Sequence, residues 1–294
     1  MNLTEAIEEF LLDQRMKGNS KLTREYYIRS LKLFLAFMGN MDVRQISLLD
    51  CKKYVVSLQD DTRKNTVSVQ SYVRALRAFL TWLYNNEYTE MNIPAKLKLP
   101  KAQNTVKDVL TAAEVDRLFS SFNENTFTGL RDLCMISFML GSGLRRAEVI
   151  TMKADSLHID AGYALVTGKG NKQRNVPIGE YAAKKLRLYM RVRPEAEYLF
   201  TLADGKPLSD VTVKDLFRKL KRRTGIKRLH PHLLRHTFAT MYLTNGGNIY
   251  TLQTILGHTS LEMVKKYLHI APGYVIANFG KYSPIDVKNG HHDS

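Results

Sequence analysis

The sequence predicts two domains, an all-α N-terminal domain and an α+β C-terminal domain with a small three-stranded antiparallel sheet. The first part of the chain shows only helical apolar patterns, whereas three short strand-like segments interrupt the helices of the second part. Between the two parts, the segment IPAKLKLPKAQNTVKDV has two prolines, four lysines and no helical period, which is typical of an exposed linker. We therefore assign residues 1–92 to the first domain, 93–109 to the linker and 110–294 to the second domain.

Four helices are predicted in the first domain. The first begins with a capping box formed by Asn2 and Glu5, and the second begins at Thr23 and ends at a Gly-Asn pair. Ser47 caps a short third helix, and a fourth runs from about Thr66 to Asn85 with its apolar residues at helical spacing. Four amphipathic helices of this length are enough to enclose a hydrophobic core.

The chain is strongly basic, with 44 Lys and Arg against 28 Asp and Glu and a formal net charge of +16. Such an excess favours nucleic acid as a partner, although a protein that only stays soluble or rests on an acidic membrane surface would share it. Cations on or just before the predicted fourth helix form either a solvated face or a phosphate-contacting face: Lys64, Arg74 and Arg77.

The sequence indicates a soluble protein of the prokaryotic cytoplasm. Cys51 and Cys134 both fall in apolar helical patterns, so we expect reduced core residues and no disulfide. The N-terminus lacks the basic and apolar regions of a signal peptide. The most apolar run, residues 133–144, is shorter than the roughly 20 residues that a membrane span needs.

In the second domain, a capping box opens at Thr111, and turns rich in glycine separate the strand-like segments. The predicted strands are 157–159, 163–167 and 175–178, and the later helices are 130–140, 147–152, 181–191, 211–224, 233–245, 249–256 and 261–268.

Polar residues interrupt these apolar patterns at two early places. Arg145 follows a Gly-Ser-Gly turn, where an arginine serves either as a structural salt bridge or as an anion clamp. Lys169 and Lys172 stand at the tip of a glycine-rich hairpin, which either reaches into a groove or is simply solvated. Lys172 and Arg174 are candidate DNA contacts. The hairpin is not a Walker loop, because the required spacing and the following helix are missing.

Two later segments add histidines, an arginine and a tyrosine. His232 and Arg235 are three residues apart and share a helical face, which places a proton carrier beside an anion clamp. His232 and His236 have zinc-binding spacing, but no glutamate lies between them and no third ligand is obvious. Tyr267 follows His258 on an amphipathic helix, where a tyrosine is ordinarily a core or interface residue.

Taken together, these motifs resemble those of the tyrosine recombinase (phage integrase) family, and of its Xer-like two-domain members in particular. The stretch GLRRAE is similar to the first arginine motif, GKGNKQR to the lysine hairpin, HLLRH to the H-x-x-R box, and LGH with Tyr267 to the terminal motif. The resemblance covers essentially the whole chain. It implies a four-helix, SAM-like core-binding domain and a catalytic domain of the tyrosine recombinase type.

The resemblance also implies a mechanism of DNA cleavage and rejoining. Tyr267 would attack the scissile phosphorus to give a 3′-phosphotyrosine and a free 5′-hydroxyl, while Arg145 and Arg235 clamp the non-bridging oxygens. The remaining expected roles are leaving-group protonation by Lys169, handling of the tyrosine proton by His232, a phosphate hydrogen bond from His258 and orientation by Glu148. The covalent link keeps the energy of the broken bond, so we expect neither a cofactor nor a metal ion, and EDTA should not prevent cleavage.

The implied partner is double-stranded DNA with paired recombination half-sites, bound by a homotetramer. The segment 271–287 after the tyrosine is apolar enough to dock, either in a neighbouring protomer or within its own. Rival functions are a type IB topoisomerase, a DNA-binding regulator with the same fold and a metal-dependent nuclease. The sequence does not reveal the target site, any accessory factor, or whether the task is integration, excision, resolution or inversion.

Overall fold

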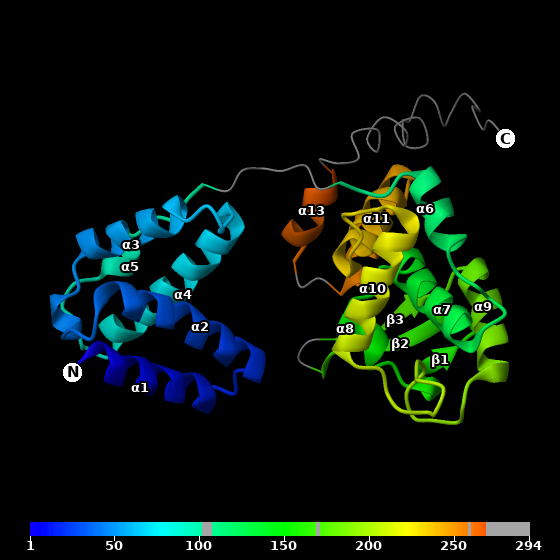
Figure 1. Cartoon of the computed structure of the whole chain (residues 1–294), viewed down its shortest axis with the longest axis horizontal. Helices are drawn as coiled ribbons and strands as arrows, with labels where there is room; N and C mark the ends of the chain where they lie inside the picture. Colours follow the sequence, from blue (N-terminus) through cyan, green and yellow to red (C-terminus); the bar gives the residue numbers. More distant parts are fainter. Residues whose placement is uncertain (102–107, 169–170, 258–259, 269–294) are drawn as a thin grey trace, which may run out of the picture. The chain divides into compact units, whose positions relative to one another are not determined.

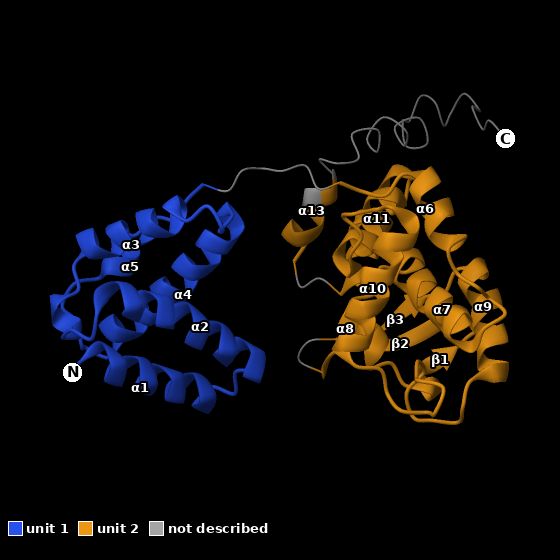
Figure 2. Cartoon of the chain, in the orientation of Figure 1, with its two compact units in different colours: residues 1–105 blue, residues 106–294 orange. Residues whose placement is uncertain are grey.

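The computed structural model describes residues 1–101, 108–168, 171–257 and 260–268, and it divides the chain into two compact units. The first unit spans Met1–Thr105 and the second Val106–Ser294 (Figure 2). Within the described residues the first unit is entirely helical, and the second combines helices with one antiparallel sheet (Figure 1). The predicted fold class is therefore confirmed.

The first unit is built from four long helices, α1 (Leu3–Met16), α2 (Lys21–Met38), α3 (Leu48–Asp60) and α4 (Thr66–Asn85). The short 3-10 helix η1 (Val43–Gln45) lies between α2 and α3. The predicted capping box is present at the start of α1, where Asn2 accepts from the backbone of Glu5 and the Glu5 carboxylate accepts from the Asn2 backbone. A second capping box, between Ser47 and Asp50, opens α3. Edge-to-face contacts of Phe10 with Phe79 and Trp82 join α1 to α4 in the core.

The expected linker is shorter than the sequence predicts. A short helix, α5 (Ile93–Lys96), follows α4, and both Ile93 and Leu97 are buried in the core of the first unit. The proline and lysine content of this segment suggested an exposed chain, but Pro94 occupies the first turn of a helix, where proline is well tolerated. The start of the predicted linker, 93–97, thus belongs to the first unit.

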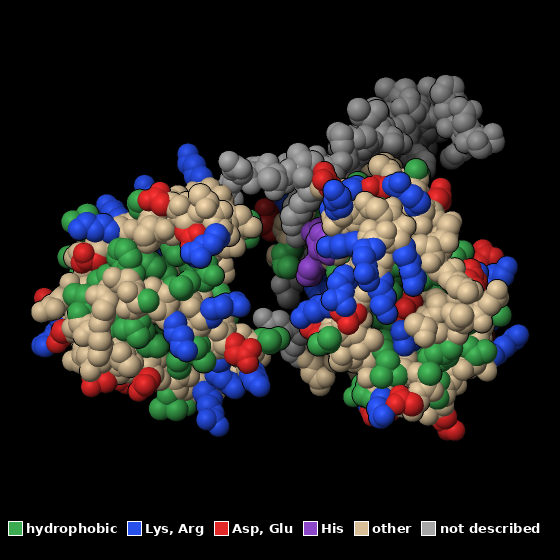
Figure 3. All heavy atoms as spheres, in the orientation of Figure 1, with side chains coloured by type: hydrophobic (Ala, Val, Ile, Leu, Met, Phe, Trp, Pro, Cys, Tyr) green, Lys and Arg blue, Asp and Glu red, His purple; other side chains and the backbone are tan. Residues whose placement is uncertain are grey.

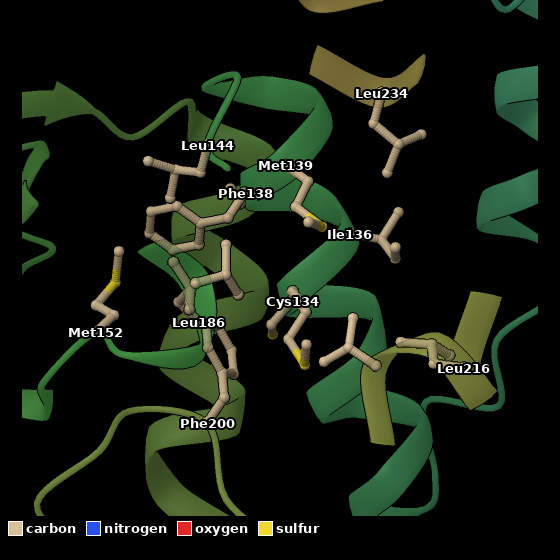
Figure 4. Packing of buried hydrophobic residues seen from close by; sticks show 14 of the residues in the cluster. Cys134, Ile136, Phe138, Met139, Leu144, Met152, Leu186, Phe200, Leu216 and Leu234 are labelled. Atoms are coloured by element: carbon tan, nitrogen blue, oxygen red, sulfur yellow. The ribbon is translucent and has the colours of Figure 1, made fainter. Parts of the chain in front are cut away.

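The second unit is organised around α7 (Phe127–Gly141), a helix that is buried on nearly all sides. Its residues Cys134, Phe138 and Met139 pack with Leu186 from α9 (Glu180–Val192) and with Phe200 in the main hydrophobic core (Figure 4). The helices α6 (Ala112–Phe119), α8 (Arg146–Ile150) and α10 (Asp210–Thr224) complete this part of the unit.

The sheet has the strand order β1-β2-β3 and both pairings are antiparallel. After the 3-10 helix η2 (Ala154–Ser156), its strands are β1 (Leu157–His158), β2 (Tyr163–Thr167) and β3 (Gln173–Pro177). Strand β3 begins two residues earlier than predicted, so Arg174 lies inside the strand, opposite Val166 of β2, and not in the turn.

The last described helices are α11 (Pro231–Thr244), α12 (Ile249–Leu256) and α13 (Glu262–Leu268). They enclose a second, smaller cluster of buried side chains contributed by all three helices: Ala239, Leu243, Leu252, Leu256, Val264 and Tyr267. In the part of the chain that the structure describes, no helix is long and apolar enough to cross a bilayer.

Candidate active site

Arg145 stands immediately before α8, at the end of the Gly-Ser-Gly turn. Gly143 in this turn has a φ of +65°, and a Cβ there would lie 2.4 Å from the Phe238 ring, so only glycine fits between the turn and α11. The Arg145 Nη1 donates to Glu148 Oε1 at 2.8 Å, and its backbone N–H donates to Glu148 Oε2 at 2.8 Å. The side chain remains 33% exposed, which leaves the guanidinium accessible from solvent.

Arg235, on α11, is buried and lies within the electrostatic influence of Arg145. Its Nη1 donates to the carbonyl of Gly143 at 2.7 Å and its Nη2 to the carbonyl of Leu256 at 2.8 Å. Burial, with a smaller contribution from the charge of Arg145, lowers the pKa of Arg235 to about 10. The side chain therefore stays protonated at neutral pH, and it ties the arginine turn to the end of α12.

His232 lies one turn before Arg235 on α11. Partial burial lowers the pKa of its imidazole below the ordinary value, and the charges of His230, Arg235 and Arg145 act in the same direction. His232 is consequently neutral at pH 7 and able to accept a proton.

Tyr267 is buried in the cluster that joins α11, α12 and α13, with 1% of its surface exposed. Its hydroxyl lies 2.9 Å from Nδ1 of His236, and the two rings are 5.5 Å apart between centroids. Burial raises the pKa of Tyr267, while the positive charges of Arg235 and Arg145 oppose that rise. The tyrosine thus lies within the field of both arginines but inside the protein.

Glu148 is buried and accepts hydrogen bonds from Arg145 and from a second arginine. Arg174 of β3 donates from Nη1 and Nη2 to the two Glu148 carboxylate oxygens, each at 3.0 Å. Burial by itself would raise the pKa of Glu148, but hydrogen bonds from Arg174 and Arg145 outweigh it and leave this pKa below its usual value.

The DNA contact predicted for Arg174 stays a prediction, and in the structure its side chain has partners within the protein. Its side chain is only 11% exposed, and its Nε donates to the carbonyl of Ile255 at 2.7 Å. Three of its five N–H donors are thus engaged by a buried carboxylate and a main-chain carbonyl.

The other candidate DNA contacts occupy varied positions. Lys64 forms an ion pair with Asp61, and its side chain is only 20% exposed. Arg74 is exposed and donates to Gln70, whereas Arg77 is half-buried on the same helix. Lys172 is exposed beside the hairpin tip.

Two predicted catalytic residues, Lys169 and His258, lie outside the described residues. The structure describes their immediate neighbours: Gly168 donates to the carbonyl of Lys172 to close the hairpin, and Gly257 ends α12 in a left-handed conformation. Both glycines lie beside Arg174: a Cβ on Gly168 would be 3.5 Å from its Nη1, and a Cβ on Gly257 would be 3.1 Å from its Nε.

His236 is the residue whose role the sequence did not reveal. Its spacing from His232 suggested only a metal site, and nothing in the helical pattern showed that α13 would pack against α11. Among the residues that the structure describes, no group of three or more His, Cys, Asp or Glu side chains could hold a metal ion.

A helical domain followed by this α+β domain, with two arginines, a histidine and a tyrosine brought together from separate elements, defines a tyrosine-type site-specific DNA recombinase. The chain belongs to the phage integrase family: residues 108–273 match the model of that family, and residues 6–90 match its N-terminal SAM-like domain.

Individual relatives agree with this membership. The chain is 28% identical over 293 residues to tyrosine recombinase XerC of Lacticaseibacillus casei, covering 95% of this chain and 97% of the relative. It is 32% identical to tyrosine recombinase XerC of Xylella fastidiosa, covering 86% and 88% of the two chains. Among solved structures, the Tn1549 transposon integrase in complex with a circular intermediate DNA superposes with a TM-score of 0.76 at 20% identity, covering 91% of this chain and 94% of the other.

Proposed function

We propose that this recombinase cleaves DNA through nucleophilic attack by Tyr267 on a phosphate held at Arg145 and Arg235. The observation that carries the proposal is the convergence of these side chains. Arg145 precedes α8, Arg235 lies on α11 and Tyr267 on α13, yet the tyrosine is close enough to both arginines for their charges to oppose the rise in its pKa that burial causes. A cationic pair beside a phenol suits transfer of a phosphoryl group, since the arginines stabilise both the phosphate and the phenolate.

The remaining roles follow the same chemistry. Neutral His232 accepts the tyrosine proton, and Glu148 fixes the orientation of Arg145 through two hydrogen bonds. Lys169 protonates the departing 5′-oxygen and His258 contacts the phosphate, as the family motifs suggest. The expected product of cleavage is a 3′-phosphotyrosine that a second DNA strand later attacks, with no metal ion in the reaction.

The buried tyrosine represents a resting arrangement of the site. A tyrosine with only 1% of its surface exposed cannot bring its hydroxyl to the roughly 3–3.5 Å from a phosphorus atom that attack requires. Helix α13 must therefore shift and break the hydrogen bond to His236 before cleavage. The cluster that holds α13 is small, so this movement disturbs only the packing of α11 and α12 against it.

The DNA interface of the second unit is centred on α10. Lys214, Arg218 and Lys221 lie four and three residues apart on one exposed face of this helix. With Arg146 and His230 they line an open groove of about 270 Å³ that leads to the start of α11. Lys and Arg side chains gather over α10 in the space-filling view, next to a histidine patch (Figure 3). This cationic face is suited to double-stranded DNA. Lys172 and, in the first unit, Arg74 and Arg77 are further candidate DNA contacts.

Recombination needs four strands cut, so we propose that four copies assemble on two paired half-sites, in the prokaryotic cytoplasm where the DNA lies. The segment 271–287 lies outside the described residues, and its predicted docking in a neighbouring protomer remains part of this proposal. Truncation at Pro272 should abolish assembly, seen by native electrophoresis on two-site DNA, and preserve binding to one half-site. Assembly that survives the truncation would exclude exchange of this segment.

A plasmid assay tests recombination directly. Duplexes that become covalently attached to the protein are first selected from a random pool, and two copies are placed in one supercoiled plasmid. We expect strand exchange between the two copies, which rearranges the plasmid DNA that lies between them. Relaxation without exchange would instead indicate a topoisomerase, and binding without any strand breakage would indicate a regulator.

A further inference from the structure

The strongest unassigned feature of the second unit is the set of hydrogen bonds around Arg174. This side chain comes from β3, contacts Glu148 of α8 through both terminal nitrogens, and contacts the Ile255 carbonyl of α12 through Nε. One guanidinium therefore joins three elements that lie far apart in the sequence. The planar fork of arginine is suited to such a bridge, because it donates in several fixed directions at once.

The bridge reaches Arg145 through Glu148. Each carboxylate oxygen of Glu148 accepts hydrogen bonds from both arginines. Oε1 accepts from Nη1 of Arg145 and from Nη1 of Arg174. Oε2 accepts from the backbone N–H of Arg145 and from Nη2 of Arg174. Because Glu148 is only 5% exposed, water does not replace a lost partner easily. Without Arg174, the carboxylate would turn toward its remaining partner and change the direction in which Arg145 is held.

The bridge also holds the end of α12. The last two carbonyls of this helix accept from two different arginines, Ile255 from Arg174 and Leu256 from Arg235. Cations at a helix C-terminus are favourable because the exposed carbonyls carry partial negative charge. Gly257 packs on the same arginine, and a Cβ there would lie 3.1 Å from Cδ, Nε and Cζ of Arg174.

We infer that Arg174 is a positioning residue for phosphate activation: through Glu148 and the end of α12 it sets the geometry of Arg145 relative to Arg235. This inference rests on the proposed role of Arg145 as a phosphate clamp. It assigns to Arg174 a role other than binding DNA. Lys172, two residues earlier in the same hairpin, is by contrast an exposed cation.

The test compares Arg174→Ala, Arg174→Lys and Lys172→Ala in the full-length protein on a selected cleavable duplex. Single-turnover adduct formation is measured at saturating DNA, and DNA affinity is measured as a function of salt. A misplaced clamp should slow cleavage by on the order of 10²-fold in both Arg174 variants, because lysine cannot contact Glu148 and Ile255 together. Binding and its salt dependence should stay at the wild-type level in both. Lys172→Ala should instead reduce the salt slope of DNA binding by about one.

A substrate with a methylphosphonate at the scissile position separates positioning from general loss of structure. The methyl group removes the negative charge that Arg145 would neutralise, so the defect of both Arg174 variants should shrink at least about tenfold, as should that of Arg145→Ala. Arg174→Lys keeps this test decisive if Arg174→Ala does not fold.

Three results would overturn the inference: an equal defect on both substrates, wild-type cleavage by the Arg174 variants, or a reduced salt slope like that of Lys172→Ala. If the wild-type protein itself forms no adduct, the proposed active site fails and this inference fails with it. Normal wild-type cleavage with unaffected Arg174 variants would remove this inference alone.

Discussion

Replacing His236 by leucine is expected to accelerate DNA cleavage. The Tyr267 hydroxyl is held 2.9 Å from His236 Nδ1 and is almost fully buried, so this hydrogen bond must break before attack. A side-chain hydrogen bond contributes about 0.5–1.5 kcal/mol net, which corresponds to about a 2- to 13-fold change in the population of released tyrosine. If release precedes a slower chemical step, the cleavage rate rises by the same factor.

The assay for this prediction is single-turnover formation of the covalent adduct, quenched in SDS, with wild-type protein, His236→Leu and His236→Asn. The asparagine amide lies close to the position of Nδ1 and keeps a partner for the tyrosine, so this control should react at about the wild-type rate. A fall of about tenfold or more in both His236→Leu and His236→Asn would refute the reasoning, because neither side chain can carry a proton. It would show that His236 takes part in proton transfer.

Three further predictions concern pH, salt and stability. His232 has a lowered pKa in the folded state, so the unfolded chain binds a proton more readily than the folded protein. The free energy of unfolding should therefore be independent of His232 ionisation above pH about 6.5 and should fall as the pH drops below that value. Urea titrations should show that His232→Gln removes this fall. Arg218→Ala or Lys221→Ala should each reduce the salt slope of DNA binding by about one, whereas Arg187→Ala, which removes an exposed cation of α9 outside the groove, should leave it unchanged. Arg235→Lys should destabilise the protein by about 1–3 kcal/mol in urea unfolding, because one amine cannot satisfy the buried carbonyls of both Gly143 and Leu256, and an unchanged midpoint would contradict these contacts.

Much of the fold is determined by local chemistry that is visible in the sequence. The capping boxes at Asn2 and Thr111 and the glycine-rich turns between strands act over a few residues, so their elements appear close to where they were expected. Helix α5 was missed because its stability comes from burial of Ile93 and Leu97 against the first unit, which four residues of sequence do not reveal.

The sequence suggested candidate residues for the site but not the contacts that they make. Arg174 was predicted to contact DNA, and the third strand was predicted to begin only at residue 175. Its true partners, Glu148 and Ile255, are 26 and 81 residues away along the chain. The pairing of His236 with Tyr267 likewise depends on the packing of α13 against α11, which only tertiary structure defines.

The chemistry proposed for Tyr267 is tested most directly by covalent trapping. Wild-type protein and Tyr267→Phe are incubated with fragmented genomic DNA in EDTA, quenched in SDS, and the attached DNA is digested and mapped by mass spectrometry. We expect an adduct on Tyr267 through a 3′-phosphate in the wild-type protein and no adduct in the variant, which should still bind DNA. An adduct that persists in Tyr267→Phe, or DNA cleavage by the wild-type protein without any covalent link, would contradict the proposed nucleophile.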